Sequence, residues 1–305
     1  MPDIQHSIIA YQGELFALGA AFLWAMSSVL LKTLGKTIRP LELNLIKGAI
    51  GFVLFAITTV IIGEKFAAIR PMAIIALSIS GAVGIGFGDT MFYESINRLG
   101  ASRTLLVTTL APPLTVIFAW IFLRESLTLV SGLGILITTL GIIWVVTEKE
   151  QSNGEEKTRV NWLGLFFAFL AALTQAAGAV LSRWALTEST VSPLQSALSR
   201  LLGGTLVLIL WIVVKREKIG AWLRPAPGLK FWGILAIVQI FGTYIAIWFQ
   251  QMAFKNSPVG IAQTLLATSP IFVLPIAALQ KEKLSLRSIL RVLVSIAGVC
   301  LLFLV

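Results

Sequence analysis

Long apolar runs separated by short polar segments recur along the whole chain. Ten of these runs contain 18 or more residues with few charges, enough for a helix to cross a hydrocarbon layer of about 30 Å. Because backbone groups in lipid must form their hydrogen bonds within the segment, we predict an all-α membrane protein with ten transmembrane helices. The predicted helices are 13–34, 41–62, 72–93, 101–123, 128–147, 162–186, 194–214, 231–252, 259–279 and 288–305.

The order of these segments divides the chain into two halves of five predicted helices. The tail, the first half, the hydrophilic connection and the second half are residues 1–12, 13–147, 148–161 and 162–305. Three landmarks share one offset of 157 residues: Pro113 with Pro270, Glu125 with Glu282, and Gly141 with Gly298. We interpret this as an internal duplication. Since five is odd, two such units in succession would cross the membrane in opposite directions, as the inverted repeats of many secondary transporters do.

Each half has proline near the middle of its fourth predicted helix. Pro112 and Pro113 lie in the first half and Pro270 in the second. Proline removes an amide donor and displaces the carbonyl four residues earlier. In lipid that carbonyl needs another partner or a watery cavity. We therefore predict a helix break that lines the substrate path, with a simple packing kink as the alternative.

The arrangement around these prolines resembles the EamA-type transporters of the drug/metabolite transporter superfamily. In both halves a proline-broken apolar helix ends in a basic–acidic pair, Arg124-Glu125 or Lys281-Glu282, and a glycine-containing last helix follows. The resemblance covers nearly the whole chain. It implies a secondary transporter that exports an amino acid, or a related amine or carboxylate, through a midplane cavity between the inverted five-helix repeats.

Composition agrees with a membrane protein and limits the partners. The mean hydropathy is +0.91, and only 12% of the residues are charged, too few for the surface of a soluble domain. A net charge of +10 would suggest nucleic acid in a soluble protein. Here the basic residues lie in short loops, so we expect a lipid bilayer and a small-molecule substrate as partners, no nucleic acid, and a monomer or weak homodimer.

Lysine and arginine gather in the loops that follow the odd-numbered predicted helices. By the positive-inside rule, this bias places both termini outside the cytoplasm. The first dozen residues contain no Lys or Arg, so we expect no cleavable signal peptide. The expected location is the cell (inner or plasma) membrane, which the chain crosses many times.

Few residues offer redox, metal or covalent chemistry. Cys300 is the single cysteine and His6 the single histidine, which excludes an intrachain disulfide and a multi-cysteine metal site. The apolar runs contain no Ser/His/Asp set, so a membrane-embedded enzyme is disfavoured. The glycine-rich segment 81–88 follows no strand, and we interpret it as close helix packing rather than a phosphate loop. We expect no cofactor and no metal, with transport driven by the substrate gradient or by protons.

Two cations lie inside predicted membrane helices. Lys47 and Arg200 occupy equivalent places in the two halves. A cation at the centre of a membrane costs at least about 2.5 kcal/mol, so each is a candidate for contact with substrate or a counter-ion. The alternatives are snorkelling to the interface and structural pairing, for which Glu42 is a possible neighbour of Lys47.

Asp89 is the acidic counterpart near the end of the third predicted helix. Tyr93 lies four residues later and shares its helix face. An intramembrane acid can couple transport to protons or bind a cationic group, and Asp89 is our candidate coupling site. The alternative is an ion pair with Arg98 or Arg103 that holds the turn into the fourth helix. The second half has Ala246 at this position, an asymmetry that favours function.

Further polar and aromatic side chains interrupt the apolar helices. They are Trp24, Ser27, Ser28, Gln175, Gln239, Tyr244, Trp248, Gln250 and Gln263. Amide side chains are uncommon in lipid without partners, and helix–helix packing is the alternative role of each. We predict a substrate site formed by Trp24, Ser27, Lys47, Tyr93, Gln175, Arg200, Tyr244, Trp248 and Gln263.

An exchanger of phosphorylated sugars or nucleotide-sugars is the alternative to amino-acid export. It requires convergent cations in the cavity, a role open to Lys47 and Arg200. Glu125 and Glu282 are flanked by basic residues. We expect them to form interfacial ion pairs with these neighbours and to act in topology and gating.

Overall fold

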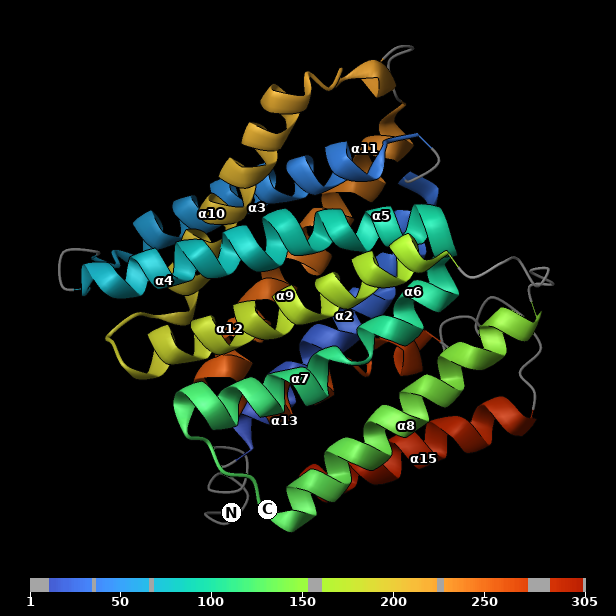
Figure 1. Cartoon of the computed structure of the whole chain (residues 1–305). Coiled ribbons are helices and arrows are strands. Elements are labelled where there is room, and N and C mark those ends of the chain that lie inside the picture. Colours follow the sequence, from blue (N-terminus) through green and yellow to red (C-terminus); the bar gives the residue numbers. More distant parts are fainter. Residues whose placement is uncertain are drawn as a thin grey trace.

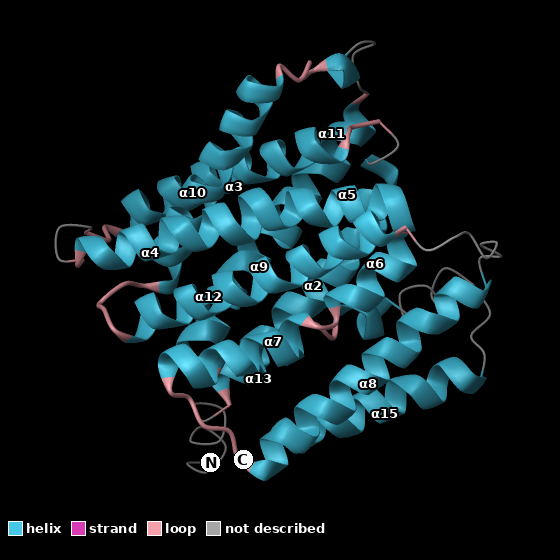
Figure 2. Cartoon of the chain, in the orientation of Figure 1, coloured by secondary structure: helices cyan, strands magenta, loops and turns pink. Residues whose placement is uncertain are grey.

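The computed structural model describes residues 11–34, 37–65, 69–152, 161–223, 228–273 and 286–303. All regular structure in these ranges is helical (Figure 2). The first half contains α2 (Gln12–Leu34), α3 (Pro40–Ile62), α4 (Pro71–Gly81), η2 (Ala82–Gly88), α5 (Asp89–Leu99), α6 (Ala101–Thr108), α7 (Ala111–Phe118), η3 (Ala119–Leu123) and α8 (Leu129–Ser152). The second half contains α9 (Trp162–Thr187), α10 (Pro193–Lys215), η4 (Ala221–Leu223), α11 (Leu229–Ile237), η5 (Val238–Ile245), α12 (Ala246–Asn256), α13 (Val259–Leu266) and α15 (Leu286–Leu302).

Each of the ten predicted ranges contains a helical segment, and several are long enough to cross a membrane. Within the described residues, six helices have both the length and the apolar composition of a membrane span: Pro40–Ile62, Pro71–Leu99, Arg103–Leu123, Trp162–Thr187, Pro193–Lys215 and Leu229–Asn256. Shorter apolar helices accompany them at Leu129–Trp144, Val259–Val273 and Leu293–Leu302. The tail 1–10, the connection 153–160, the end of the ninth predicted helix and Glu282 lie outside the described residues.

The third predicted helix is longer than the sequence indicated. α4, η2 and α5 follow one another without a break and end at Leu99, six residues beyond the predicted end. Hydropathy excludes these last turns because they are polar, but Arg98 pairs with Glu94 one turn earlier at 3.4 Å and so supports the helix. Gly100, with a φ of 84°, ends it.

The outer surface of the bundle is apolar. On α3, Val60 and Ile61 are 79% and 78% exposed, and Val213 and Val214 on α10 are exposed to a similar degree. Large aliphatic side chains exposed in contiguous stripes are unfavourable in water. In a bilayer the same surface contacts lipid chains of equal polarity, so the helices need no polar outer face.

Small residues bring helices of the two halves into backbone contact. A Cβ atom on Gly81 of α4 would collide with the main-chain carbonyl of Arg200 in α10, and one on Gly203 of α10 would collide with the carbonyl of Ser78. This close approach is typical of transmembrane helices with small residues at their crossing. The packing role predicted for the glycine-rich segment is confirmed at Gly81.

The last helices of the two halves, α8 and α15, run in opposite directions. α8 packs along α15 at the lower right of Figure 1. Gly298 contacts Thr138, and Gly141 contacts Ser295. Gly298 matches Gly141, and Ser295 matches Thr138, each at an offset of 157 residues. The second contact is therefore the first contact with the two halves exchanged. A two-fold axis perpendicular to α8 and α15 would produce this relation between the halves.

The two halves interlock rather than forming separate bundles. α2 packs against α12 of the second half, and α9 packs against α5 of the first half (Figure 1). Gly13 at the start of α2 contacts Ser257 after α12, while Gly164 at the start of α9 contacts Leu99 at the end of α5. The first helix of each half thus lies against the third helix of the other, and the interface between the halves runs through the centre of the molecule.

Candidate substrate-binding site

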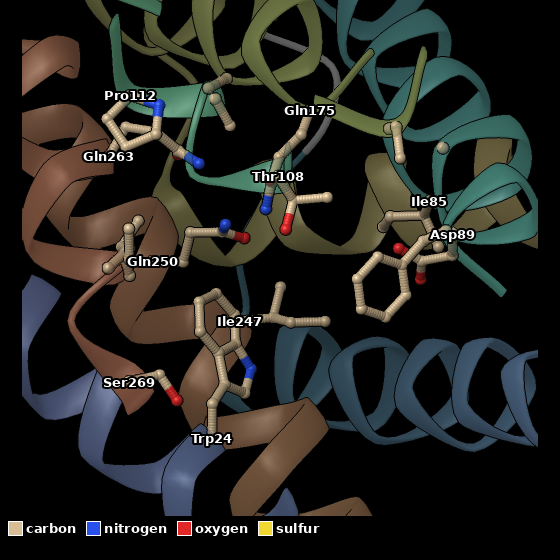
Figure 3. A pocket seen from close by; sticks show the side chains of 18 of the residues that line it. Trp24, Ile85, Asp89, Thr108, Pro112, Gln175, Ile247, Gln250, Gln263 and Ser269 are labelled. Carbon is tan, nitrogen blue, oxygen red and sulfur yellow. The ribbon is translucent and has the colours of Figure 1, made fainter. Parts of the chain in front are cut away.

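A cavity of about 360 Å³ lies at this central interface, with walls from both halves. Figure 3 shows Thr108, Gln175, Gln250 and Gln263 directed into a common space, with Asp89 on the opposite side from Gln263. Small-molecule sites usually measure about 300–1,000 Å³ and combine apolar walls with a few polar groups. The volume and lining of this cavity therefore suit a small polar molecule.

The two proline breaks form part of the cavity wall. α6 ends at Thr108 and α7 begins at Ala111, so Pro112 lies in a first helical turn, where its missing N–H costs nothing. In the second half α13 ends at Leu266, and Pro270 follows. Thr108, Pro112, Leu266 and Pro270 all line the cavity. Both fourth helices are therefore interrupted where the cavity lies, as expected for irregular backbone at membrane depth.

Both third helices widen into a π-helical turn beside the cavity. η2 and η5 lie at equivalent positions of the two halves. Gly84 and Gly88 of η2 and Gly242 of η5 line the cavity. Single π-helical turns often mark functional sites, because they shift the side chains that follow on the helix. Asp89, the residue directly after η2, also lines the cavity.

Lys47 and Asp89 form an ion pair in the cavity wall. Lys47 Nζ lies 2.8 Å from Asp89 Oδ2, and the side chains are 29% and 31% exposed. Lys47 thus takes the place that the sequence analysis gave to Arg98 or Arg103, and Arg98 pairs with Glu94 instead. Each charge of such a pair depends on the other, because removing one leaves its partner unpaired in a region of low dielectric constant.

Glu42 does not accompany Lys47, contrary to the possibility considered from the sequence. Its carboxylate accepts hydrogen bonds from Arg39 Nε at 2.7 Å and from the backbone N–H of Gly220 at 3.0 Å. The hydrogen bond to Glu42 raises the pKa of the Arg39 guanidinium above its usual value. These bonds hold the start of α3 against the segment that follows α10.

Arg200, the equivalent of Lys47, lies in the same wall and is only 6% exposed. Its Nη1 donates to Gln250 Oε1 at 3.4 Å, which is long for a hydrogen bond. Its Nε has no hydrogen-bond partner among the described residues. Gln250 is the repeat equivalent of Tyr93. The first half therefore presents its cation beside a carboxylate, and the second half presents its cation beside an amide.

Three more of the predicted site residues line the cavity. Trp24 donates from Nε1 to the carbonyl of Gly242 at 3.0 Å, which fixes the indole against η5. Gln175 is exposed and points into the cavity (Figure 3). Gln263 is 3% exposed, and its Oε1 has no hydrogen-bond partner within the described part of the chain.

The remaining predicted residues lie outside the cavity lining. They are Ser27, Tyr93, Pro113, Tyr244 and Trp248. Ser27 packs against Gly242 behind the wall. The Tyr244 hydroxyl shares a hydrogen bond of 2.7 Å with Thr58 Oγ1, and its ring packs on Trp248 with the centroids 6.0 Å apart. Ser27, Tyr244 and Trp248 therefore make packing contacts and do not line the cavity.

The structure also adds lining residues that the sequence analysis missed. Phe92 and Ser269 are two of them. Phe92 lies three residues after Asp89, whereas the sequence analysis chose Tyr93, four residues after it. Both spacings share a helix face, so spacing alone does not decide between them. Ser269 lies beside Pro270, and the proline was the signal that pointed to this segment.

A polar cavity between two halves of opposite direction, lined by interrupted helices, is the architecture of secondary transporters. The chain belongs to the EamA-like transporter family, whose model matches residues 11–147 and again residues 162–304. This confirms the resemblance drawn from the prolines and the basic–acidic pairs. The protein is a multi-pass protein of the cell membrane.

Curated relatives match parts of the chain. Uncharacterized membrane protein YMR253C of Saccharomyces cerevisiae is 41% identical over 70 residues, 23% of this chain and 17% of that protein. Uncharacterized transporter YvbV of Bacillus subtilis is 30% identical over 139 residues, 44% of this chain and 45% of that protein. The chain spans less than half the length of these relatives in each match.

A solved structure shares the fold over almost the whole chain. That crystal structure is 16% identical, covers 97% of this chain and 98% of its own, and superposes with a TM-score of 0.78. The similarity supports the helix arrangement alone.

Proposed function

We propose that the protein is a secondary transporter that exports a small polar metabolite, an amino acid or a related amine or carboxylate. In this proposal ten transmembrane helices form two inverted five-helix repeats, and the central cavity opens alternately to the two sides of the membrane. The observation that carries the proposal is the cavity itself. It combines both helix breaks with Lys47, Asp89 and Arg200 at the interface of the halves.

A network of ionic hydrogen bonds reaches the cavity at Phe254, and in this proposal it closes that end. Glu125, at the end of the first half's fourth helix, accepts from Arg183 Nε at 2.7 Å and from the backbone N–H of Val259 at 3.0 Å. Arg183 in turn donates to the carbonyls of Phe254 and Lys255. The predicted partner of Glu125 was its neighbour in sequence, but its carboxylate binds the turn between α12 and α13. We call this network the Glu125 latch.

A second carboxylate holds the same turn. Ser257 Oγ donates to Glu14 Oε1 at 2.7 Å, and both side chains are buried. Phe254, which belongs to the latch, also lines the cavity. Release of the α12–α13 turn would therefore open the cavity at this end. The interruption after Leu266 provides a hinge between the turn and the rest of the fourth helix.

Asp89 is the group through which protons would drive transport. A proton on its carboxylate would remove the negative charge that holds Lys47 and so change the charge of the cavity. We expect Asp89→Asn to abolish the pH dependence of uptake into proteoliposomes. Glu94→Gln is the matched control, because the Glu94–Arg98 pair lies outside the cavity lining. Unchanged pH dependence in Asp89→Asn would remove proton coupling at this residue from the proposal.

The orientation proposed from the loop charges places both termini outside the cytoplasm. In this orientation the segment 153–160 is cytoplasmic. A cysteine introduced there should therefore not react with impermeant maleimide in intact cells, and a reaction would contradict the proposed orientation.

The exchanger of phosphorylated sugars is less well supported than amino-acid export. Lys47 is already neutralised by Asp89, which leaves one unpaired cation, Arg200, for a dianionic phosphate among the described lining residues.

Ligand binding and transport test the proposal together. Thermal unfolding of the purified protein should shift to higher temperature with amino acids, amines or carboxylates, since a ligand that binds only the folded state stabilises it. The same compounds should be transported by proteoliposomes. If sugar phosphates alone stabilise the protein, and Lys47→Ala removes this stabilisation, the exchanger becomes the better proposal in place of amino-acid export.

A further inference from the structure

Arg200 lines the cavity without a salt bridge to any described residue. Its side chain is buried, its Nε has no hydrogen-bond partner in the described part of the chain, and its Nη1 makes one long bond to the Gln250 amide oxygen. Gly84 lines the cavity beside it, and a Cβ atom there would lie 3.7 Å from Nη2. The glycine leaves this side of the guanidinium open. A buried guanidinium without an anion is unfavourable, so this part of the wall favours a negatively charged ligand.

The two halves differ in the acid that accompanies the cation. In the first half Lys47 Nζ lies 2.8 Å from Asp89 Oδ2. The second half repeats the cation as Arg200, but its equivalent of Asp89 is Ala246. Ala246 is fully buried and does not line the cavity. The second half therefore lacks a carboxylate of its own, and the cavity is the side from which a negative charge can reach Arg200.

The charges of the cluster set the charge of the ligand. Asp89 acts electrostatically on Arg200 as well as on Lys47, and the two cations repel one another. Two cations and one acid leave one net positive charge. A monovalent anion would make the cluster neutral, a zwitterion would leave its charge unchanged, and a dianion would reverse it. Water in the cavity can accept hydrogen bonds from the guanidinium but brings no compensating charge.

We propose that Arg200 binds one chloride ion from solution at the cavity wall. A carboxylate pairs with arginine most strongly through two parallel hydrogen bonds. Here Nη1 is directed at Gln250 and Nε is covered by protein atoms, so neither fork of the guanidinium is free. A spherical ion needs no fork and can bind on the open side of Nη2. The ion is a ligand in addition to the transported molecule, and it would stay bound when a zwitterion enters the cavity.

The first test compares anions on the purified wild-type protein without any organic ligand. Thermal unfolding is measured in detergent while sodium chloride replaces sodium gluconate at constant ionic strength, which keeps charge screening equal. We expect chloride to raise the unfolding temperature by about 2–4 °C, with saturation at high concentration. Sodium acetate and sodium sulfate should give a smaller rise. Equal unfolding temperatures in chloride and gluconate, or a larger rise in acetate or sulfate, would overturn the proposal.

Two variants should abolish the chloride response for opposite reasons. Arg200→Gln removes the cation. Gln250→Glu keeps the shape of the side chain and places a carboxylate at Arg200 Nη1, so it supplies the missing charge itself and should raise the unfolding temperature in gluconate above that of the wild type. A merely structural role of Gln250 predicts no such rise. The matched control is Arg98→Gln, which should keep the full response because the Arg98–Glu94 pair lies outside the cavity lining.

Asp89→Asn tests the charge count itself. It leaves Lys47 and Arg200 as two cations without an acid beside them. The dissociation constant of chloride, obtained from the concentration dependence of the unfolding temperature, should fall by about tenfold. A higher dissociation constant than in the wild type would contradict the electrostatic basis of the site.

The variants also state what would remove the site. A chloride response that persists in Arg200→Gln, or that is the same in Gln250→Glu as in the wild type, would overturn the assignment of Arg200. If Arg200→Gln does not fold, the anion comparison on the wild type and the Gln250→Glu variant still decide. None of these measurements involves transport, so their failure would leave the proposed transport function standing.

Discussion

Two cations and one acid at the cavity decide how the site responds to substitution. Lys47 and Asp89 are about one-third exposed to the cavity, so their interaction lies between that of a surface pair and that of a fully buried one. Arg200 lies near enough to Asp89 for an electrostatic interaction. Loss of the acid therefore leaves two cations together, whereas loss of Lys47 leaves Asp89 with one remaining cation.

This asymmetry predicts an order of stabilities. Asp89→Asn should lower the free energy of unfolding by about 1–3 kcal/mol, and Lys47→Met by less. The double variant should recover part of the loss, because it restores the net charge of the cluster. Thermal unfolding in detergent measures all three against Glu94→Gln, which removes the half-exposed pair with Arg98 and should cost little. A larger loss in Lys47→Met than in Asp89→Asn would refute this electrostatic explanation.

Among the helices, the crossing of α4 and α10 places Arg200 at the cavity. The main-chain carbonyl of Arg200 lies against Gly81, so the position of its side chain depends on this close approach. Gly81→Ala should separate the helices, destabilise the protein by about 1–3 kcal/mol and weaken ligand binding. Gly132→Ala is the matched control, because a Cβ there meets nothing within 4 Å and alanine favours the helix. Equal stabilities of the two variants would contradict the close crossing.

The Glu125 latch makes a prediction about access to the cavity. Hydrogen bonds to charged groups contribute about 1.5–3 kcal/mol each, so Glu125→Gln should raise the fraction of molecules open at this end by about tenfold. A cysteine probe measures this open fraction. Ser269→Cys is introduced in a Cys300→Ser background, which removes the exposed free thiol. Impermeant maleimide added on the Glu125 side should label Glu125→Gln faster than the parent.

The control for Glu125→Gln is Glu64→Gln, at the same end of the bundle. Glu64 accepts a hydrogen bond from Ser192 at the start of α10, away from the α12–α13 turn. Glu64→Gln should leave the labelling rate unchanged. Equal labelling of the Glu125→Gln variant and its parent would show that the latch does not close the cavity.

Over the whole chain, the helices and the duplication could be predicted because both depend on local sequence patterns. Apolar runs set the helices, and the common offset of Pro113 and Pro270 identified the repeat. The odd number of predicted helices in each half predicted opposite directions for the repeats, and α8 and α15 do run in opposite directions. The end of α5 was misplaced because Glu94 and Arg98 are polar yet support one another on the helix.

The wall of the cavity was less predictable because it depends on contacts between distant segments. Nothing local links Lys47 with Asp89, which are 42 residues apart, or Glu125 with Arg183. The π-helical turn before Asp89 has no clear sequence signal, and Phe92 rather than Tyr93 lines the cavity. Trp24, Gln175 and Gln263 were predictable because a polar group in an apolar helix needs a partner or a cavity.

Counterflow in proteoliposomes tests alternating access through the central cavity most directly. Vesicles loaded with an excess of the unlabelled amino acid that gives the largest thermal shift are diluted into its labelled form. If the carrier exposes one site to each side in turn, the label should rise transiently above its equilibrium level inside loaded vesicles. Arg200→Gln should abolish this rise. A monotonic approach to equilibrium, equal in loaded and empty vesicles, would contradict alternating access.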